Sequence, residues 1–572
     1  MEINQSERKR GFYLFIAFSA WVLTIAVVLV KIQVFDYGKN IGKVRSQSNR
    51  TIELHSKRGT IYDRHGDVLA ISVKAQSAFL NCKDKTDSFR LFNTILKNGL
   101  QLTENENRAI RFRIGKGDKF IWLKRKLADT EYSMLKKIKD ADSANSDLDF
   151  VEEYMRVYPQ NTIAAHILGG VGIDEQGLYG VEYTLNSVVS GKGGIAKVVQ
   201  DARRKVFNLQ YVQTPEPGKD IYLTIDSSIQ FFVEQELEKT VTAFQAKSGA
   251  VIVMNSQDGS ILAMACYPNY NPGYVSDVPL KLTKNNAISF LYHPGSTFKV
   301  ILASTALEKN ICSPQQQFDC FNGSYHFRNV TISDVHPYAS LSFEDIIIHS
   351  SNIGAARISE MLGKQTWYDG IQNFGFGSKV GIRLPGEESG IVHPLSSWSG
   401  VSLEFLAHGY ELAVTPIQMI RAFNVLASGG YLIQPTIVKE IDGAFLKKPQ
   451  KKKIMSPSTV QRMVSIMTEV VSRGTGKNTQ IPGIEIAGKT GTTKIIRRGN
   501  KDDTNPRLYI SSFGGFFPAK NPKVTIFVVV DEPKGQYYGG DVAAPLFKSI
   551  AEKLLIYLKI FPEMDKRNEI RL

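Results

Sequence analysis

Ser296 and Lys299 stand three residues apart in the segment from His293 to Lys299, where a Pro-Gly break precedes the serine. The pair places a nucleophilic hydroxyl beside an amine that can act as its base. The apolar run Val300 to Ala303 predicts a helix that puts both side chains on one face, with Ser296 at its amino end. The pattern is weak by itself, since residue frequencies give on the order of two chance Ser-x-x-Lys matches in a chain of this length.

Two further motifs follow along the chain: Ser350-Ser351-Asn352 and Lys489-Thr490-Gly491-Thr492. They indicate acyl transfer, in which Ser296 attacks a carbonyl and Lys299, kept neutral in a partly desolvated site, takes its proton. Lys489, on a strand edge facing the helix, would lower the pKa of Lys299. Ser350 would relay a proton to the leaving amine, and Asn352 would hold the substrate amide.

The Lys-Thr-Gly-Thr strand suits substrate binding. Gly491 has no side chain, so a substrate can lie against this edge as an added strand. The N–H groups of Thr492 and Ser296 would form an oxyanion hole, and the hydroxyls of Thr490 and Thr492, backed by Lys489, suit a carboxylate. A surface helix and strand without catalysis is the competing interpretation, which the three motifs in this order disfavour.

These residues need an extracytoplasmic scaffold, which the N-terminus predicts. Residues 11–30 carry no charge, and at about 1.5 Å per residue they span the roughly 30 Å hydrocarbon layer. No small-x-small cleavage site follows, so we expect an uncleaved anchor rather than a signal peptide. Arg8-Lys9-Arg10 precede it and only Lys31 follows directly, which places the N-terminus in the cytoplasm and the rest outside.

The net charge of +15 over 572 residues arises from dispersed basic residues. With the predicted topology, this excludes nucleic acid and favours anionic lipid or cell-wall polymer as a neighbour. The densest run, residues 447–453, is typical of a solvated loop. Cys82, Cys266, Cys312 and Cys320 are too few for a disulfide-built fold, and the sequence leaves open whether Cys312 and Cys320 pair.

The segments before Thr214 predict a scaffold. Residues 58–70 predict a hairpin that carries a buried Arg/Asp pair. Residues 85–150 are charged and helix-like, and residues 156–194 are glycine-rich, with His166 as a packed side chain. The Pro/Gly segment 214–218 predicts a domain boundary.

Beyond that boundary the pattern predicts a helix from Ser227 and a β-hairpin from the apolar runs 249–254 and 260–265. A largely helical stretch runs from Ser296 to about residue 440. Strands at 484–487, 512–517 and 524–530 and a helix at 544–555 complete the chain. This order indicates an α+β domain with one antiparallel sheet assembled from both ends.

The three motifs in this order resemble the signature of penicillin-binding proteins and class A β-lactamases. Nearly the whole chain is similar to the class B penicillin-binding proteins, the monofunctional transpeptidases that cross-link peptidoglycan. Residues 58–70 resemble their pedestal motif, and further similar segments are 267–272, 374–377, 415–418 and 537–545. The single anchor, the 489–494 run and the lack of an appended module after about 560 look most like the division-specific, septal enzyme.

The resemblance implies a five-stranded antiparallel sheet flanked by helices, with a helical lobe, in a transpeptidase domain at 214–560. It also implies an elongated, β-rich pedestal of the dimerisation type at 31–213 and a transmembrane helix at 11–30, between tails at 1–10 and 561–572. The implied activity is a serine D-Ala-D-Ala transpeptidase, without cofactor or metal, that acts on stem peptides and is a target of β-lactams. Implied partners are a polytopic glycosyltransferase of the shape, elongation, division and sporulation (SEDS) class and divisome membrane proteins.

Two positions depart from the family pattern. His293 stands where many relatives carry an acid, and we interpret it as a lining residue. Glu411 replaces a frequent glycine, which concerns the local loop conformation. Alternatives are an elongation-type enzyme, a β-lactamase or carboxypeptidase, and a divisome scaffold or β-lactam receptor that acylates without turnover.

Overall fold

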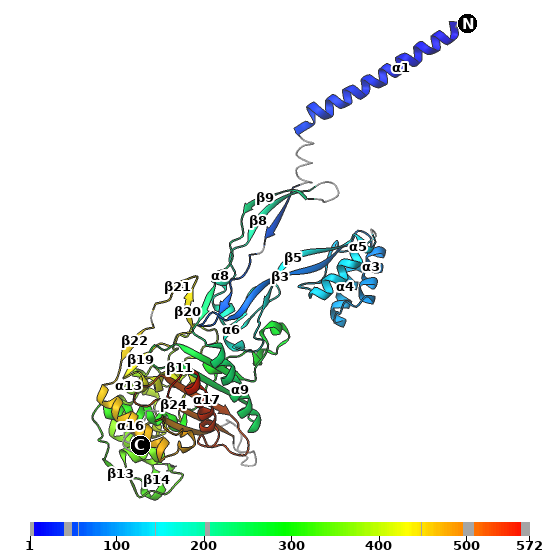
Figure 1. Cartoon of the computed structure of the whole chain (residues 1–572). Helices are drawn as coiled ribbons and strands as arrows, with labels where there is room; N and C mark the ends of the chain where they lie inside the picture. Colours follow the sequence, from blue (N-terminus) through cyan, green and yellow to red (C-terminus); the bar gives the residue numbers. More distant parts are fainter. Residues whose placement is uncertain are drawn as a thin grey trace, which may run out of the picture. The chain divides into compact units, whose positions relative to one another are not determined.

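The computed structural model describes residues 5–38, 49–54, 56–142, 145–200, 206–447, 449–495 and 508–561. They form two compact units: residues 1–57 with 191–218, and residues 58–190 with 219–572 (Figure 1). Some expectations lie outside the described residues: they concern residues 1–4 of the N-terminal tail, 39–48 after the anchor, Lys448 of the basic run and the tail from 562.

The first unit contains the predicted apolar helix. Helix α1 (Gln5–Val30) continues into a π-helical turn, η1 (Lys31–Phe35). Among the described residues, one span, Lys9–Phe35, is long and apolar enough to cross a membrane, and none of it is buried. The unit also holds a three-stranded antiparallel sheet in the order β1 (Asn49–Leu54), β8 (Gly194–Gln200), β9 (Val206–Gln213).

The second unit begins with a mixed sheet of seven strands, in the order β21-β20-β10-β2-β3-β4, with β5 paired to β3. The strands are β2 (Ile61–Tyr62), β3 (Val68–Asn81), β4 (Phe120–Lys124), β5 (Leu148–Val157), β10 (Ile221–Leu223), β20 (Val438–Ile441) and β21 (Ala444–Phe445). The predicted hairpin at 58–70 is therefore the β2–β3 pair.

The segment 85–150, expected to be helix-like, forms a small subdomain at the β3–β4 end of this sheet, which we call the head. Helices α3 (Lys85–Lys97), α4 (Glu104–Lys116) and α5 (Asp129–Ala141) pack apolar side chains such as Phe92, Ile114 and Leu135 onto β3 and β4. Thr103 and Glu106 form a capping box at the start of α4. Shorter elements connect the head to the next domain: α6 (Ala165–Leu168), β6 (Gly170–Val171), β7 (Gly177–Tyr179), α7 (Gly180–Thr184) and α8 (Asn186–Val189).

The hairpin at 58–70 was expected to carry a buried Arg/Asp pair. This prediction is wrong, because Arg58 and Asp63 are both buried but bond to other groups. Arg58 is buried, but its guanidinium bonds to Glu182 in α7, at 2.5 Å, and Arg156 Nε bonds to the other oxygen of the same carboxylate at 2.6 Å. Asp63, also buried, instead accepts from the amides of His65 and Asp67. The Glu182 carboxylate therefore accepts charge-assisted hydrogen bonds from two buried guanidinium groups.

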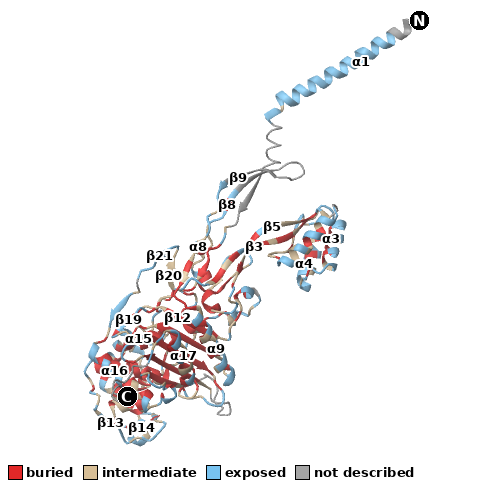
Figure 2. Cartoon of the chain, in the orientation of Figure 1, coloured by how far each residue is buried: buried red, intermediate tan, exposed pale blue. Residues whose placement is uncertain are grey.

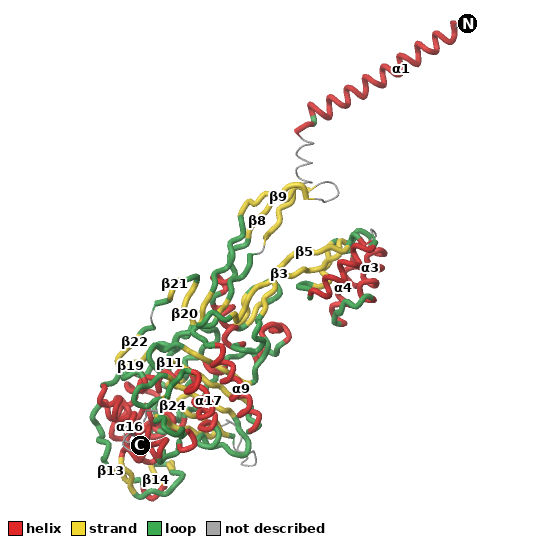
Figure 3. Tube along the Cα trace, in the orientation of Figure 1, coloured by secondary structure: helices red, strands yellow, loops and turns green. Residues whose placement is uncertain are grey.

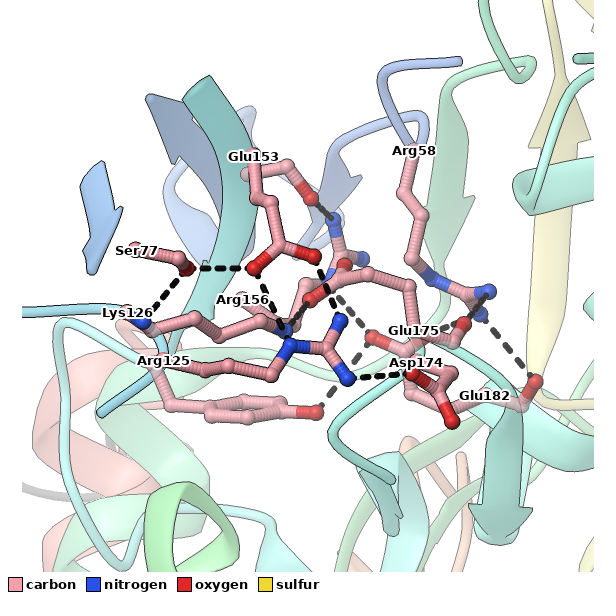
Figure 4. A network of polar contacts seen from close by, with 11 residues as sticks. Arg58, Ser77, Arg125, Lys126, Glu153, Arg156, Asp174, Glu175 and Glu182 are labelled. Atoms are coloured by element: carbon pink, nitrogen blue, oxygen red, sulfur yellow. Dashed lines mark hydrogen bonds and ion pairs between the residues drawn. The ribbon is translucent and has the colours of Figure 1, made fainter. Parts of the chain in front are cut away.

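A second group of ion pairs extends this network (Figure 4). Arg125, just after β4, bonds to Glu153 of β5 and to Asp174 of the β6–β7 turn, both at 2.5 Å. Lys126 pairs with Glu175 of the same turn. The head is therefore tied to the β6–β7 turn by charged side chains.

The predicted hairpin at 249–265 belongs to a five-stranded antiparallel sheet in the order β12-β11-β25-β24-β23, as expected. These strands are β11 (Ser248–Asn255), β12 (Ile261–Tyr267), β23 (Ala487–Lys494), β24 (Tyr509–Phe517) and β25 (Val524–Asp531). The strand expected at 484–487 starts only at Ala487, because Ile484 closes a turn by bonding back to Ile481. As a result, the whole Lys-Thr-Gly-Thr run lies on the edge strand β23.

Helices cover both faces of this sheet, and Figure 2 shows buried residues concentrated there. Alternate residues of β11 divide between the layers: Val251 and Val253 face α9 (Ser227–Ala243) and α17 (Ala543–Tyr557), while Ala250 and Ile252 join the other core. That core contains α10 (Asn286–Ser289), α11 (Lys299–Glu308), α15 (Pro416–Ala427) and α16 (Pro457–Ser472). The period of two along a central strand therefore creates two hydrophobic layers.

The stretch expected to be largely helical includes α12 (Phe343–His349), α13 (Asn352–Asn373) and α14 (Ser402–Ala407), but also short strands (Figure 3). Strand pairs are β13 (Gln317–Asp319) with β16 (Ser340–Ser342), β14 (Ser324–Phe327) with β15 (Val330–Ser333), β17 (Ile391–Val392) with β18 (Leu412–Ala413), and β19 (Tyr431–Ile433) with β22 (Lys451–Lys453). Strands this short give no usable periodicity.

Two side-chain predictions are settled by the fold. His166 is packed, as expected: its Nε2 lies 2.9 Å from the carbonyl of Leu282, and burial lowers its pKa to about 4. All four cysteines lie in the described part of the chain, and each is a free thiol, Cys312 and Cys320 included.

Candidate active site

Ser296 lies on a tight turn where the chain enters a buried helix. A 3-10 turn, η5 (Gly295–Phe298), leads directly into α11, which starts at Lys299. Gly295 has φ +56°, and a Cβ there would lie 2.4 Å from Thr493 Oγ1. Glycine is therefore required for the turn to press against β23, and this contact brings Ser296 to the sheet edge.

Lys299 and Lys489 meet at Ser350. Lys299 Nζ donates to the Ser350 carbonyl at 2.6 Å and to Asn352 Oδ1 at 2.7 Å, and it lies 3.5 Å from Ser350 Oγ. Lys489 Nζ donates to Ser350 Oγ at 2.9 Å. The Ser350 hydroxyl therefore links the three motifs, because it lies near Lys299 of the first and accepts from Lys489 of the third. Ser350 itself has φ +64°, a conformation that non-glycine residues adopt rarely and often at functional sites.

Burial makes both lysines weak bases. Each is fully buried. Burial lowers the pKa of Lys299 to about 7, against the opposing effect of the Asp334 carboxylate. Burial, together with the charge of Lys299, lowers the pKa of Lys489 well below its usual value. Both shifts favour the neutral form of the amine, which is the form that can accept a proton.

Asp334 is a site residue that the sequence did not indicate. Its carboxylate accepts from Ser351 Oγ at 2.5 Å and from the amides of Asn352 and Ile353 at 2.5 and 3.1 Å. It thereby caps α13 and fixes the turn that carries Ser350 and Asn352. An aspartate after a short strand has no sequence signature, so only the fold reveals this positioning role.

The residues of β23 are placed as expected, with their hydroxyls already engaged. Thr490 Oγ1 lies 2.7 Å from Thr475 Oγ1, and Thr492 Oγ1 accepts from the amide of Gly539 at 2.8 Å. A Cβ on Gly491 would lie 2.4 Å from Ser512 Oγ, so close packing within the sheet requires this glycine.

The sequence assigned no role to three tyrosines near this strand, although residues 537–545 resembled a family segment. Tyr509 stacks on Tyr537 with ring centroids 4.0 Å apart, and Tyr538 lies against Tyr537 at 4.6 Å. Tyr509 pairs with Lys494 at the end of β23, and Gly539 follows Tyr538 directly. The row therefore adds an aromatic wall to the polar groups of the strand.

The two positions that depart from the family pattern lie in two neighbouring segments: His293 precedes the turn of Ser296, and Glu411 follows Gly409, whose carbonyl accepts from the amide of Gly295 at 3.3 Å. His293 Nδ1 lies 2.5 Å from the carbonyl of Leu412, and its ring packs near Tyr410. Glu411 has φ +57°, the left-handed conformation that favours glycine. Glu411 therefore adopts a backbone conformation that glycine tolerates more easily than other residues.

Comparison with known proteins identifies similar chains. The model of the penicillin binding protein transpeptidase domain matches residues 249–552, and that of the penicillin-binding protein dimerisation domain matches residues 53–223. The Probable peptidoglycan D,D-transpeptidase PenA of Neisseria gonorrhoeae is 31% identical over 519 residues, 90% of this chain and 86% of the relative. The peptidoglycan D,D-transpeptidase FtsI of Escherichia coli K12 is 29% identical over 524 residues, which cover 90% of this chain and 86% of the relative. Penicillin binding protein 3 of Mycobacterium tuberculosis, complexed with ampicillin, has a TM-score of 0.68 at 25% identity and covers 90% of this chain and 98% of its own.

Proposed function

Because the chain belongs to the class B penicillin-binding proteins and is a peptidoglycan D,D-transpeptidase, we propose that Ser296 forms its acyl-enzyme with the stem peptide. The observation that carries the proposal is the meeting of Lys299 and Lys489 at Ser350 Oγ, beside the turn of Ser296. This arrangement supplies a nucleophile, a neutral amine and a proton relay.

In the proposed acylation, Ser296 Oγ attacks the carbonyl of the penultimate D-Ala, and Lys299 Nζ accepts the proton of the Ser296 hydroxyl. The oxyanion accepts hydrogen bonds from the amides of Ser296 and Thr492. The C–N bond to the terminal D-Ala then breaks, and the leaving amine receives a proton through Ser350. In the second half, the amine of a neighbouring stem peptide attacks the ester, and Ser296 regains its proton.

The remaining site residues bind the donor. Asn352 holds a peptide amide, and the strand edge at Gly491 pairs with the donor backbone. Thr490 and Thr492 receive the terminal carboxylate beside Lys489. That carboxylate favours the charged form of the Lys489 amine, so substrate binding would draw a proton onto this lysine.

The relatives and the apolar helix support a proposal for the cellular setting. One of the relatives is the FtsI of Escherichia coli. We infer a septal role, with the N-terminus in the cytoplasm, the catalytic domain outside, and partners among the SEDS glycosyltransferases and divisome membrane proteins. A fluorescent fusion at mid-cell supports this role, whereas foci along the lateral wall indicate the elongation type.

Cross-linking of nascent peptidoglycan tests the activity. The full-length chain in detergent should convert lipid-linked glycan polymer into cross-linked dimers in the presence of a glycosyltransferase, and penicillin should block the reaction. Muropeptides separated by chromatography report the product. If the chain releases D-Ala but forms no dimers, it is a carboxypeptidase; if it only acylates, it is a β-lactam receptor.

Acylation should also depend on pH through Lys299. Because its pKa is lowered to about 7, the neutral amine becomes more abundant as the pH rises through that value. We expect the second-order rate constant for acylation by a fluorescent penicillin to rise about tenfold between pH 6 and pH 8 and then level off. Stopped-flow fluorescence measures it. A rate that is flat or falls over this range contradicts the role of Lys299 as base.

A further inference from the structure

A cavity of about 310 Å³ opens where β23 ends. Its lining includes His293, three residues before Ser296, and Thr493, whose hydroxyl abuts the turn at Gly295. Its apolar wall contains Ile495 and the stacked rings of Phe290 and Tyr292, whose centroids are 5.6 Å apart. The cavity therefore lies close to the turn that carries Ser296, and the mechanism above does not use it.

The polar wall of the cavity carries charges of both signs. Asp531 and Glu532, at the end of β25, share the ammonium of Lys247 at 3.5 and 2.7 Å. Asp531 is only 4% exposed, and burial raises the pKa of its carboxyl in spite of Lys247. Lys494 is exposed on the same cavity, and within the described part of the chain its ammonium forms no ion pair.

The proposed binding mode sets the direction in which a donor peptide runs. Its terminal carboxylate lies at Thr490 and Thr492, and its scissile carbonyl lies at Ser296. The rest of the peptide must then continue along the strand edge toward Thr493 and Lys494. At about 3.3 Å per residue of extended chain, the residue before the D-Ala-D-Ala end reaches the mouth of the cavity.

We propose that this cavity is a specificity pocket for the side chain that precedes D-Ala-D-Ala, and that it prefers a side chain ending in an ammonium and a carboxylate on one carbon. The ammonium would face Asp531 and Glu532, the carboxylate would face Lys494, and the methylene stem would pack on Phe290 and Tyr292. The inference rests on the proposed function, because only a donor stem peptide runs along β23 in this way.

Three donor peptides that differ only at this residue test the pocket on the unmodified full-length chain. The residue before D-Ala-D-Ala is diaminopimelate in the first peptide, lysine in the second and norleucine in the third. The experiment measures how strongly each peptide slows labelling of the chain by fluorescent penicillin. We expect diaminopimelate to compete about tenfold better than norleucine, equivalent to about 1.4 kcal/mol, with lysine between them. Equal competition by all three would overturn the pocket.

Variants assign each end of the side chain. Lys494→Met should remove the advantage of diaminopimelate over lysine while lysine still exceeds norleucine. Glu532→Gln should make the lysine peptide compete no better than the norleucine peptide. Asp531→Asn should have the same effect if this variant folds. Glu552→Gln, in an exposed pair with Lys548 on α17, is the matched control and should keep the full order. If the Lys494→Met chain still prefers diaminopimelate to lysine, the proposal that Lys494 binds the side-chain carboxylate is contradicted.

The same experiment separates this inference from the proposed function. A chain that reacts with penicillin but is slowed by none of the three donors would overturn the transpeptidase assignment. A chain slowed equally by all three keeps that assignment and loses only the pocket. Labelling by penicillin also confirms that each variant is folded before its order of preference is measured.

Discussion

Replacing Ser296 with alanine abolishes covalent labelling by penicillin, and replacing Lys299 with alanine slows it by about 10³-fold. Without the hydroxyl no ester forms, and without the buried amine no neighbouring group accepts its proton. The two residues act as a unit, so the double variant should be no worse than Ser296→Ala. Gel fluorescence of the full-length chain, with the rate followed over time, measures both effects.

Matched substitutions separate chemistry from folding. Ser397 and Lys548 lie on the surface, and Ser397→Ala and Lys548→Ala should label at the rate of the unmodified chain. Retained labelling in Ser296→Ala would show that another residue carries the acyl group. In cells, Ser296→Ala that still supports cross-linking would rule out transpeptidation by this chain.

Replacing Glu182 with glutamine should destabilise the chain by about 3–5 kcal/mol, because two buried guanidinium groups lose their countercharge at once. Glu182 is fully buried between Arg58 and Arg156. Urea denaturation of the detergent-solubilised chain should show a lowered midpoint. Glu152→Gln, which breaks an exposed pair with Lys74 on the same sheet, should change stability by at most about 0.5 kcal/mol.

The buried charge can also be removed without leaving an unpaired ion. A triple variant with Arg58→Met, Arg156→Met and Glu182→Leu should be more stable than Glu182→Gln, since apolar residues of similar volume avoid the cost of uncompensated charge. If Glu182→Gln unfolds at the same midpoint as Glu152→Gln, the network does not contribute to stability as we describe.

The sequence predicted the sheet and the reactive residues because both depend on local patterns. Alternation and apolar runs located β11, β12, β24 and β25, and the motif order grouped Ser296, Ser350 and Lys489. By contrast, the partner of Arg58 is 124 residues away along the chain, and no local pattern points to it. Asp334 and the tyrosine row were missed for the same reason, since their roles arise only from tertiary contacts.

Strand boundaries near the site were also less predictable than its chemistry. A strand was expected at 484–487, but β23 begins only at Ala487 and extends to Lys494. The point where this strand begins depends on its pairing with β24, which residue types at 484–494 do not encode.

The turn at Gly295 restricts how this chain can evolve under antibiotic pressure. A Cβ on Gly295 would strike β23, and one on Gly409 would lie 2.3 Å from the carbonyl oxygen of Gly295. Both glycines also have positive φ, so every other residue would be strained there. We expect resistant lineages to keep both glycines unchanged. Their substitutions should accumulate instead among side chains near β23 that can vary in size, such as Tyr410 and Tyr538.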